Sequence, residues 1–357
     1  MSGKITHIES LNQVIKHLEH GNSTQKKISN LLKREEVRNY ANLGSIAPDI
    51  FYFYHVLSPK KTRRSSIWGD RSHHEKVAEL IFSFLDRVSD TEESLYRDRN
   101  LAFTLGYICH CVVDVITHPY IFYISGDYYN QDPKISYNAQ LSHMRVEYGL
   151  DSFLIHHRWG LTPNEYDFPQ HIDVQPKLPN GRKKMDSMLW KFWVDSLKET
   201  FPEEFQKDYI GSSNKILTGD ILNEAYLGLY TLSKVIDSRS TLVRGFLKFV
   251  DAVTMHKTNS TLLLLPWRHN IDPRILNEEK KEWSYPALFS KKSNESFIEL
   301  LNFAVILSKD LMTQAYEYTM SPSKKDRDNY ILKYSGYNLD TGLKEGIHQM
   351  KEFAPLG

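Results

Sequence analysis

Cysteine is scarce in this sequence of 357 residues. Cys109 and Cys111 are the only two, and they lie two positions apart. Two cysteines at this spacing exclude a framework of several disulfides and do not match a Cys-x-x-Cys metal site. A reducing compartment is the simplest interpretation, so we expect the protein to be cytoplasmic.

The sequence also lacks an excess of charge of either sign and a recognisable secretion signal. Its 45 Lys and Arg residues almost balance its 44 Asp and Glu residues, which leaves a formal net charge of +1. No overall field therefore attracts nucleic acid, and no stable nucleic-acid complex is expected. Residues 1–18 do not combine a cationic start with a following apolar stretch, so they do not resemble a signal peptide.

Long apolar runs are rare as well, and the one that stands out covers residues 101–124. The stretch LAFTLGYICHCVVDVITHPYIFYI is nearly free of charge and long enough to cross a bilayer. Asp114 near its middle would cost about 2.5–3.5 kcal/mol on membrane insertion. His110, His118 and Pro119 add to that cost. We therefore expect a buried helix here and no transmembrane segment.

Helical periodicity dominates the remaining sequence, which favours an all-α fold. Residues 72–88 (SHHEKVAELIFSFLDRV) show an apolar stripe at helical spacing, with two histidines in the first turn of the expected helix. The preceding SPKKTRRSSIWGD predicts a basic, polar loop. Residues 161–186 contain four prolines and little periodicity, which predicts a long connection, and helical patterns resume from residue 187.

The apolar run at 101–124 carries three polar groups in a regular pattern. His110, Asp114 and His118 are spaced i, i+4 and i+8, and such positions drift by only about 40° per step on an α-helix. All three side chains are therefore expected on one face, while the opposite face packs into the core. An isolated buried carboxylate is very unfavourable, so these groups need a common partner.

A second predicted helix supplies matching groups. NAQLSHMRVEYGLDSFLIHHRWG carries His143 and Glu147 at i and i+4. Beside the first helix, it would direct several imidazoles and carboxylates to one point, where a divalent cation would compensate the charges. Imidazole and carboxylate without thiolate suit Zn²⁺, and also permit Mn²⁺ or Fe²⁺. The sequence has no HExxH motif and no adjacent His-Asp pair, and the spacing of His143 and Glu147 does not match the Glu-x-x-His order of a ferritin-like site.

Three further positions extend this set. His7 shares the apolar stripe of an expected helix near the start of the sequence, His73 or His74 opens the helix at 72–88, and Asp49 follows Pro48 in a turn. A hydrogen-bonded His-Asp pair that only supports the fold is the alternative interpretation of any one of these features. Their combination favours a metal site.

At these residues the chain resembles the zinc-dependent phospholipase C family, which is related to the S1/P1 nucleases. The matching elements are THIESLNQVIKHL, GSIAPDIFYFYH, GDRSHHEKV, LGYICHCVVDVITHPY and LSHMRVEYGLD, in the order of the family and within about residues 1–160. The weaker WSYPALFSKKSNESFIELLNFAVILSKDLM continues the resemblance into the second half. The resemblance implies an all-α phospholipase C/P1 nuclease-like bundle with a helical C-terminal extension, and two or three Zn²⁺ ions.

Carried over to this sequence, the resemblance implies three ion sites. One ion would take Asp49, His73 or His74, His110 and Asp114, and a second would take His118, His143 and Glu147. A third would take His7 and share Asp114. In secreted members an N-terminal tryptophan completes this third site, whereas this sequence begins Met1-Ser2-Gly3, and His118 follows Asp114 by four residues rather than six.

The resemblance also implies an activity. We expect a zinc-dependent phosphoester hydrolase of phospholipase C type, in which metal-activated water attacks a phosphodiester and Asp49 is the candidate catalytic base. A nuclease or nucleotidase with the same metal cluster is one alternative, and a non-catalytic, metal-stabilised helical scaffold is another. The substrate would be a phosphoester, either a phospholipid headgroup or a nucleotide. The expected organisation is a metal-binding catalytic core at 1–160, the connection at 161–186 and a helical extension at 187–357 packed on the core.

Overall fold

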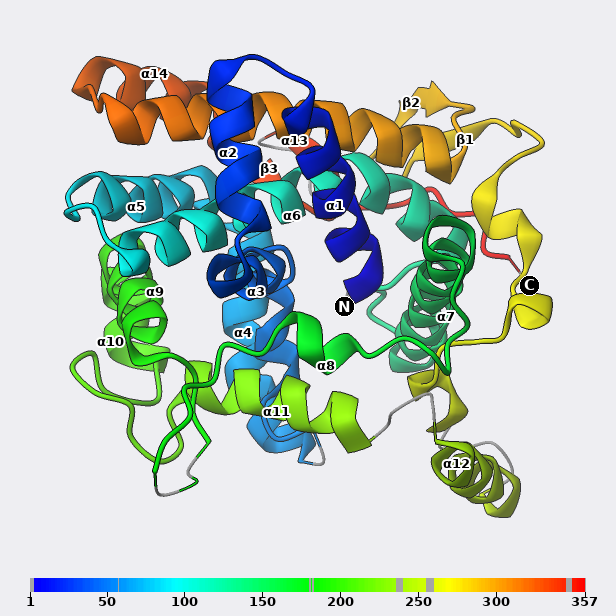
Figure 1. Ribbon diagram of the computed structural model, residues 1–357. Coiled ribbons are helices and arrows are strands. Elements are labelled where there is room, and N and C mark those ends of the chain that lie inside the picture. Colours follow the sequence, from blue (N-terminus) through cyan, green and yellow to red (C-terminus); the bar gives the residue numbers. More distant parts are fainter. Residues whose placement is uncertain are drawn as a thin grey trace.

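The protein is an all-α bundle with two very small sheets (Figure 1). This computed structural model describes residues 3–56, 58–179, 181, 183–235, 240–254, 260–344 and 349–356. Its α-helices are α1 (Lys4–Glu19), α2 (Ser23–Lys33), α3 (Glu35–Gly44), α4 (Pro59–His74), α5 (Val77–Ser89), α6 (Leu95–Ser125), α7 (Pro133–Trp159), α8 (Phe168–His171), α9 (Ser187–Thr200), α10 (Pro202–Asp208), α11 (Ile221–Val235), α12 (Thr241–Val253), α13 (Phe297–Met320) and α14 (Lys324–Tyr334).

Short 3₁₀ helices and two antiparallel strand pairs complete the described elements. The 3₁₀ helices are η1 (Ala47–Phe53), η2 (Ser260–Leu263), η3 (Arg268–Asn270) and η4 (Pro273–Leu276). The strands are β1 (Trp283–Tyr285) paired with β2 (Leu288–Ser293), and β3 (Tyr337–Asn338) paired with β4 (Leu343–Lys344).

Helix α6 is the central element of the bundle. Its first turn is capped by the Ser94 side chain, which accepts a hydrogen bond from the backbone N–H of Arg97. Helices α1, α3, α5, α7, α9 and α13 all pack against it. The helix is long and apolar enough to cross a membrane, but 89% of its most apolar window is buried inside the protein, so this is weak evidence for a span. Burial within the bundle explains the apolar run without a bilayer.

A close crossing of α3 and α6 brings two parts of the site together. Gly44 of α3 lies against α6, where an added Cβ would come 2.1 Å from the backbone oxygen of Phe103. Gly106 of α6 meets α3 in the same way, since its Cβ would come 2.1 Å from the backbone oxygen of Ala41. Only glycine allows the two backbones to approach this closely. As a result the end of α3 and the following η1 lie beside the middle of α6.

Three local expectations from the sequence are wrong. The basic segment that begins at Ser58 is not a loop, because Pro59 takes the first position of α4 and the helix continues to His74. The histidines at 73 and 74 therefore end α4 instead of opening the next helix, and Lys76, with a φ of 48°, separates α4 from α5. A run of helices also does not fill the second half, since 3₁₀ helices and the β1–β2 pair lie between α12 and α13.

Elements from the second half pack directly on the first half. Helix α9 lies against α5 and α6, and α13 lies against α6 and α1. A capping box formed by Ser296 and Glu299 fixes the start of α13. The β3–β4 turn reaches the end of α4, where the backbone N–H of Leu339 donates to the backbone oxygen of His73 at 2.9 Å. The division of the chain at residues 160 and 187 stays a prediction.

Candidate metal centre

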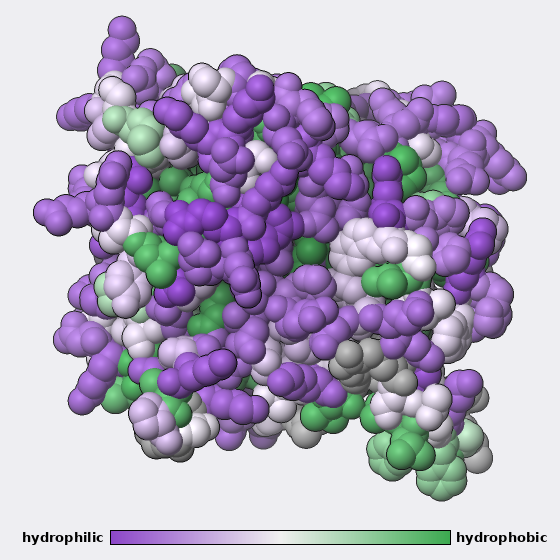
Figure 2. All heavy atoms as spheres, in the orientation of Figure 1, coloured by the Kyte–Doolittle hydropathy of each residue, from purple (hydrophilic) through white to green (hydrophobic). Residues whose placement is uncertain are grey.

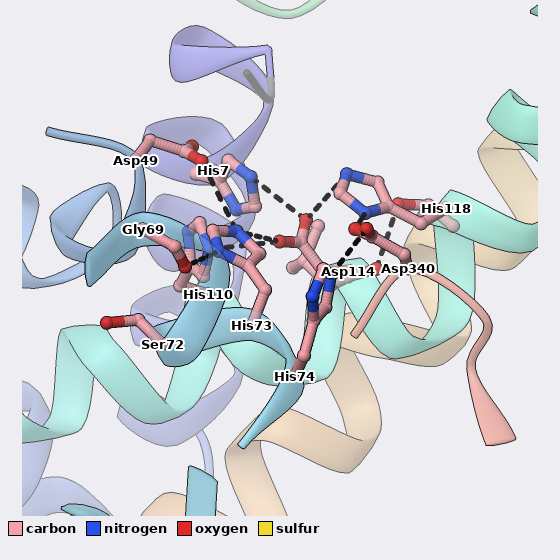
Figure 3. Close-up of polar contacts among 12 residues, drawn as sticks. His7, Asp49, Gly69, Ser72, His73, His74, His110, Asp114, His118 and Asp340 are labelled. Atoms are coloured by element: carbon pink, nitrogen blue, oxygen red, sulfur yellow. Dashed lines mark hydrogen bonds and ion pairs between the residues drawn. The ribbon is translucent and has the colours of Figure 1, made fainter. Parts of the chain in front are cut away.

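The polar face of α6 is buried at the centre of the bundle. His110, Asp114 and His118 project from successive turns, as their spacing predicts (Figure 3). Nε2 of His110 lies 2.9 Å from Oδ2 of Asp114, and Nε2 of His118 lies 3.2 Å from Oδ1. The three side chains are at most 4% exposed. Asp114 thus directs one carboxylate oxygen to each histidine.

Two other helices add imidazoles to the same carboxylate. Nε2 of His7 from α1 lies 3.2 Å from Oδ1 of Asp114, and Nε2 of His73 from α4 lies 3.6 Å from Oδ2. Figure 3 shows these imidazoles around Asp114 together with those of α6. His7 also stacks on His110, with ring centroids 4.2 Å apart. Asp114 is therefore the common neighbour of four histidines.

Asp49 brings a second carboxylate to one side of Asp114. It lies in η1, just after Pro48, and its Oδ1 is 3.3 Å from Nε2 of His73. Two groups of possible metal ligands lie here. Asp49, His73 and His110 form the Asp49 group, in which one ligand atom from each residue lies within 4.8 Å of the others. His7, His110 and Asp114 form the His7 group, to which the same distance limit applies. All the side chains in these two groups are buried.

A third group lies on the other side of Asp114. Nε2 of His143 is 2.9 Å from Oε1 of Glu147, one turn further along α7, and Nε2 of His118 is 3.8 Å from the same oxygen. His118, His143 and Glu147 also place one ligand atom each within 4.8 Å of one another, and we call them the His118 group. Because His118 faces both Asp114 and Glu147, the third group adjoins the first two.

The outer nitrogen atoms of two imidazoles have backbone acceptors of their own. Nδ1 of His73 lies 2.8 Å from the backbone oxygen of Gly69, and Nδ1 of His110 lies 3.0 Å from that of Ser45. A carbonyl oxygen only accepts, so each Nδ1 carries a proton. In the neutral tautomer that keeps this proton, the Nε2 lone pair faces the centre. This tautomer is the one a metal-binding histidine adopts when its second nitrogen is hydrogen-bonded.

Electrostatics favour a cation among these groups. Burial lowers the pKa of His110, with Asp114 only partly opposing this effect, so the ring is neutral at pH 7. Its Nε2 lone pair then faces Oδ2 of Asp114 at 2.9 Å, which is repulsive unless positive charge lies nearby. Burial alone would raise the pKa of Asp114, but positive charge on neighbouring imidazoles, including His118, whose own pKa is raised, holds it well below its usual range. The carboxylate is therefore charged.

Unused polar atoms and free space fit the same interpretation. Within the described part of the chain, both carboxylate oxygens of Asp49, Nε2 of His110 and Oε2 of Glu147 are buried and make no hydrogen bond. A cavity of about 10 Å³ lies among His7, Asp114, His118 and Glu147, which is about the space that one water or ion occupies. Donors of this type without thiolate are those that zinc accepts in hydrolytic sites, so the residues fit the metal.

His74 lies outside the three groups. Its Nε2 is 2.7 Å from Oδ2 of Asp340, a residue of the β3–β4 turn, and its side chain is 27% exposed. Oδ1 of Asp340 lies 3.2 Å from Nδ1 of His118, and the hydroxyl of Tyr129 also donates to Asp340. Figure 3 shows Asp340 between His74 and His118. Of the two neighbouring histidines, His73 is the one that faces Asp49 and Asp114.

Two carboxylates outside the three groups support the site, and sequence reasoning missed the first of them, Asp340. Asp340 has no motif around it that points to a metal, although Asn338 to Gly342 (NLDTG) is a turn signal. Asp151 of α7 accepts from the backbone N–H groups of Ile5 and Thr6 at 3.2 and 2.7 Å and from the Thr6 hydroxyl at 2.8 Å. It therefore caps the start of α1 and fixes His7 one turn later.

A larger cavity of about 360 Å³ is lined by Lys4, Tyr52 and Tyr148 among others, and by none of the His and carboxylate side chains of the three groups. Its relation to the centre is electrostatic, since the Lys4 amine interacts with the charge of Asp49. The Lys4 ammonium lies over the rings of Phe53, Tyr148 and Phe168, with 5.2, 5.8 and 5.0 Å to the ring centroids. Burial lowers the pKa of this amine, whereas Asp151 and Asp49 raise it. The cavity thus combines aromatic walls with one amine.

Comparison with known proteins agrees with this geometry. The family model described as zinc-dependent phospholipase C matches residues 6–210, which is more than half of the chain. Searches of curated proteins and of solved structures returned no match. The matched region contains the residues of all three groups, whereas Asp340 lies beyond it. The chain belongs to the zinc-dependent phospholipase C family.

Proposed function

We propose that the protein is a zinc-dependent phosphoester hydrolase of phospholipase C type, which cleaves a phosphodiester. One observation carries this proposal. Asp114 lies at the junction of adjoining groups of buried histidines and carboxylates, and each group has the composition of a zinc site. A cluster that served only to hold helices together would need one closed set of ligands, not several adjoining sets with unused oxygens.

The geometry suggests which residues would hold two or three ions. Asp49, His73, His110 and Oδ2 of Asp114 suit one ion, with His73 preferred over His74. His118, His143 and Glu147 suit another, and His7 with Oδ1 of Asp114 suits a third. Asp340 would orient His118 through its Nδ1, as a carboxylate behind a metal-binding histidine does.

Zinc bound in these groups would lower the pKa of water toward neutrality and neutralise phosphate oxygens. Asp49 would act on the attacking water. Burial alone would raise the pKa of Asp49, but His73, whose own pKa is raised, lowers it well below its usual range, so the carboxylate is charged at neutral pH. Such a group accepts a hydrogen bond or a proton from water and orients it toward phosphorus.

The larger cavity would receive the rest of the substrate. The Lys4 amine is the cation that a phosphoester would meet there, and the aromatic rings around it offer an apolar wall. Cationic groups and water exclusion stabilise the charge on phosphate oxygens as the bond to the leaving group breaks. A phospholipid with its headgroup ester near Asp49 satisfies both features.

The test is a substrate screen with zinc-loaded protein and the variant Asp49→Asn. The panel contains short-chain phospholipids, nitrophenyl phosphodiesters and nucleotides, and the exposed Asp328→Asn on α14 serves as the matched control. We expect phosphodiester cleavage to fall at least 100-fold in Asp49→Asn and to stay within twofold in Asp328→Asn. If only nucleotides were cleaved, the protein would be a nuclease or nucleotidase with the same metal cluster.

Two other results would overturn the proposal. Full turnover by Asp49→Asn on every substrate that the wild type cleaves would remove Asp49 from catalysis. Two or three bound zinc ions without cleavage of any phosphoester would identify a metal-stabilised scaffold instead of an enzyme.

A further inference from the structure

Helix α12 exposes an apolar face that the proposed activity does not use. Leu242, Phe246, Phe249 and Val253 lie at i, i+4, i+7 and i+11, so they share one side of the helix. Their side chains are 85%, 64%, 64% and 64% exposed. In Figure 2 the surface is green at the lower right, where Figure 1 places α12, while most of the same view is purple. Four large apolar side chains in one exposed row indicate an interaction surface.

The opposite side of α12 is attached to the protein. Asp251 is buried and accepts hydrogen bonds from the backbone N–H groups and hydroxyls of Ser260 and Thr261, at 2.6 to 2.9 Å. The Arg244 guanidinium donates to the backbone oxygen of Leu265 at 3.1 Å and lies over the ring of Trp267. These contacts fix the orientation of the helix, so its apolar face is presented outward.

The side-chain charge that α12 exposes is positive, because Lys248 is exposed on the helix. The single acidic residue of α12, Asp251, is buried and held by its hydrogen bonds. An apolar row on a helix that exposes a lysine and no carboxylate matches a bilayer with anionic headgroups, because the apolar side chains enter the headgroup region while the amine stays at the lipid phosphates.

The position of α12 connects this face with the larger cavity. Leu263, at the end of η2 and in the segment that holds Asp251, is 38% exposed. It also lines the cavity of about 360 Å³ that contains Lys4 and Tyr52, and Leu265 and Leu232 line it too. A lipid in a bilayer that contacts α12 would therefore lie close to the cavity that Lys4 and Tyr52 line.

We infer that α12 is a membrane-docking helix that binds the surface of a bilayer containing anionic phospholipid and presents the cavity to lipid substrate. Leu242, Phe246, Phe249 and Val253 enter the interface, and Lys248 contacts anionic headgroups. The choice of a bilayer over other partners rests on the proposed phospholipid substrate. Helix α12 lies outside residues 6–210, the part that matches the family model.

The test measures sedimentation of the full-length, zinc-loaded protein with two kinds of vesicle, phosphatidylcholine alone and an equal mixture with phosphatidylglycerol. The variants are the double substitution Phe246→Ser with Phe249→Ser, the charge reversal Lys248→Glu, and the control Phe289→Ser. Phe289 on β2 is 67% exposed, and β2 lies at the other end of the molecule from α12 (Figure 1). The control therefore removes a similar side chain from a different surface.

We expect the wild type to bind the mixed vesicles and the double variant to bind them at least tenfold more weakly. Lys248→Glu should weaken binding about threefold and only when phosphatidylglycerol is present, and Phe289→Ser should bind within twofold of the wild type. Cleavage of a monomeric short-chain substrate should be unchanged in the double variant while cleavage in vesicles falls. Retention of monomer cleavage separates failure of docking from failure of the proposed function.

Equal vesicle binding by the wild type and the double variant would overturn the inference, as would no binding by the wild type. A dimer in solution that the double variant loses, without vesicle binding, would assign the face to a second copy of the chain and would also overturn it.

Discussion

The crossing of α3 and α6 gives a quantitative prediction through Gly106. In Gly106→Ala, the new Cβ would lie 2.1 Å from the backbone oxygen of Ala41 and 2.8 Å from the backbone N of Ser45. Neither atom is on a flexible side chain, so α3 must move as a whole. Ser45 provides the oxygen that accepts from Nδ1 of His110, and Asp49 follows four residues later. The substitution therefore acts on packing and on the Asp49 group together.

The expected cost follows from two opposing terms. Overpacking a well-packed contact costs about 1–3 kcal/mol, and a clash with main chain belongs at the upper end of that range. Alanine in place of glycine within a helix stabilises the folded state by about 1 kcal/mol, because alanine has the higher helix propensity. The net loss of unfolding free energy is therefore about 2 kcal/mol, and zinc should leave the Asp49 group at a lower chelator concentration than in the wild type.

Urea unfolding of metal-free protein measures the first effect, and zinc retention during chelator titration measures the second. The control is Gly245→Ala in α12, where an added Cβ meets nothing within 4 Å. This control should lose no stability, because the helix propensity term acts alone. A Gly106→Ala protein as stable as the wild type, with unchanged zinc retention, would refute the close crossing as the device that positions Asp49.

Three further predictions follow from the described contacts. Asp340→Asn should weaken zinc binding about 10–100-fold in the His118 group alone, because Nδ1 of His118 loses its carboxylate; equal zinc retention, measured beside His74→Phe, would argue against this role. Removal of zinc by a chelator should lower the thermal midpoint by several degrees, because binding stabilises the folded state; an unchanged midpoint in calorimetry would contradict a structural contribution. Burial raises the pKa of Cys109 to about 12 and that of Cys111 well above its usual value, so neither thiol should react with a thiol reagent at pH 8 until urea unfolds the protein, and rapid labelling of the native protein would count against their burial.

The face of α6 could be predicted from the sequence because its information is local. His110, Asp114 and His118 are separated by four residues, and helix geometry alone places such residues on one side. The pair His143 and Glu147 on α7 is predictable for the same reason. Which histidines meet which carboxylates depends on how helices cross, and the spacing along one helix does not contain that information.

The choice between His73 and His74 shows this limit. Both are adjacent in the sequence, and the expected helix at 72–88 placed them in its first turn. They lie instead in the last turn of α4, because Pro59 starts a helix in a segment whose basic and polar residues suggested a loop. Asp340 could not be found from local sequence patterns, since it lies 222 positions from His118 in the sequence.

The most direct test of the account is the zinc content of Asp114→Asn, measured by elemental analysis beside the wild type and the exposed control Asp328→Asn. Asp114 is the shared neighbour of His7, His73, His110 and His118. We predict two or three zinc ions per chain in the wild type and the control, and the loss of more than one ion in a folded Asp114→Asn protein. A wild type without zinc, or an Asp114→Asn protein that retains the full number of ions, would contradict the account.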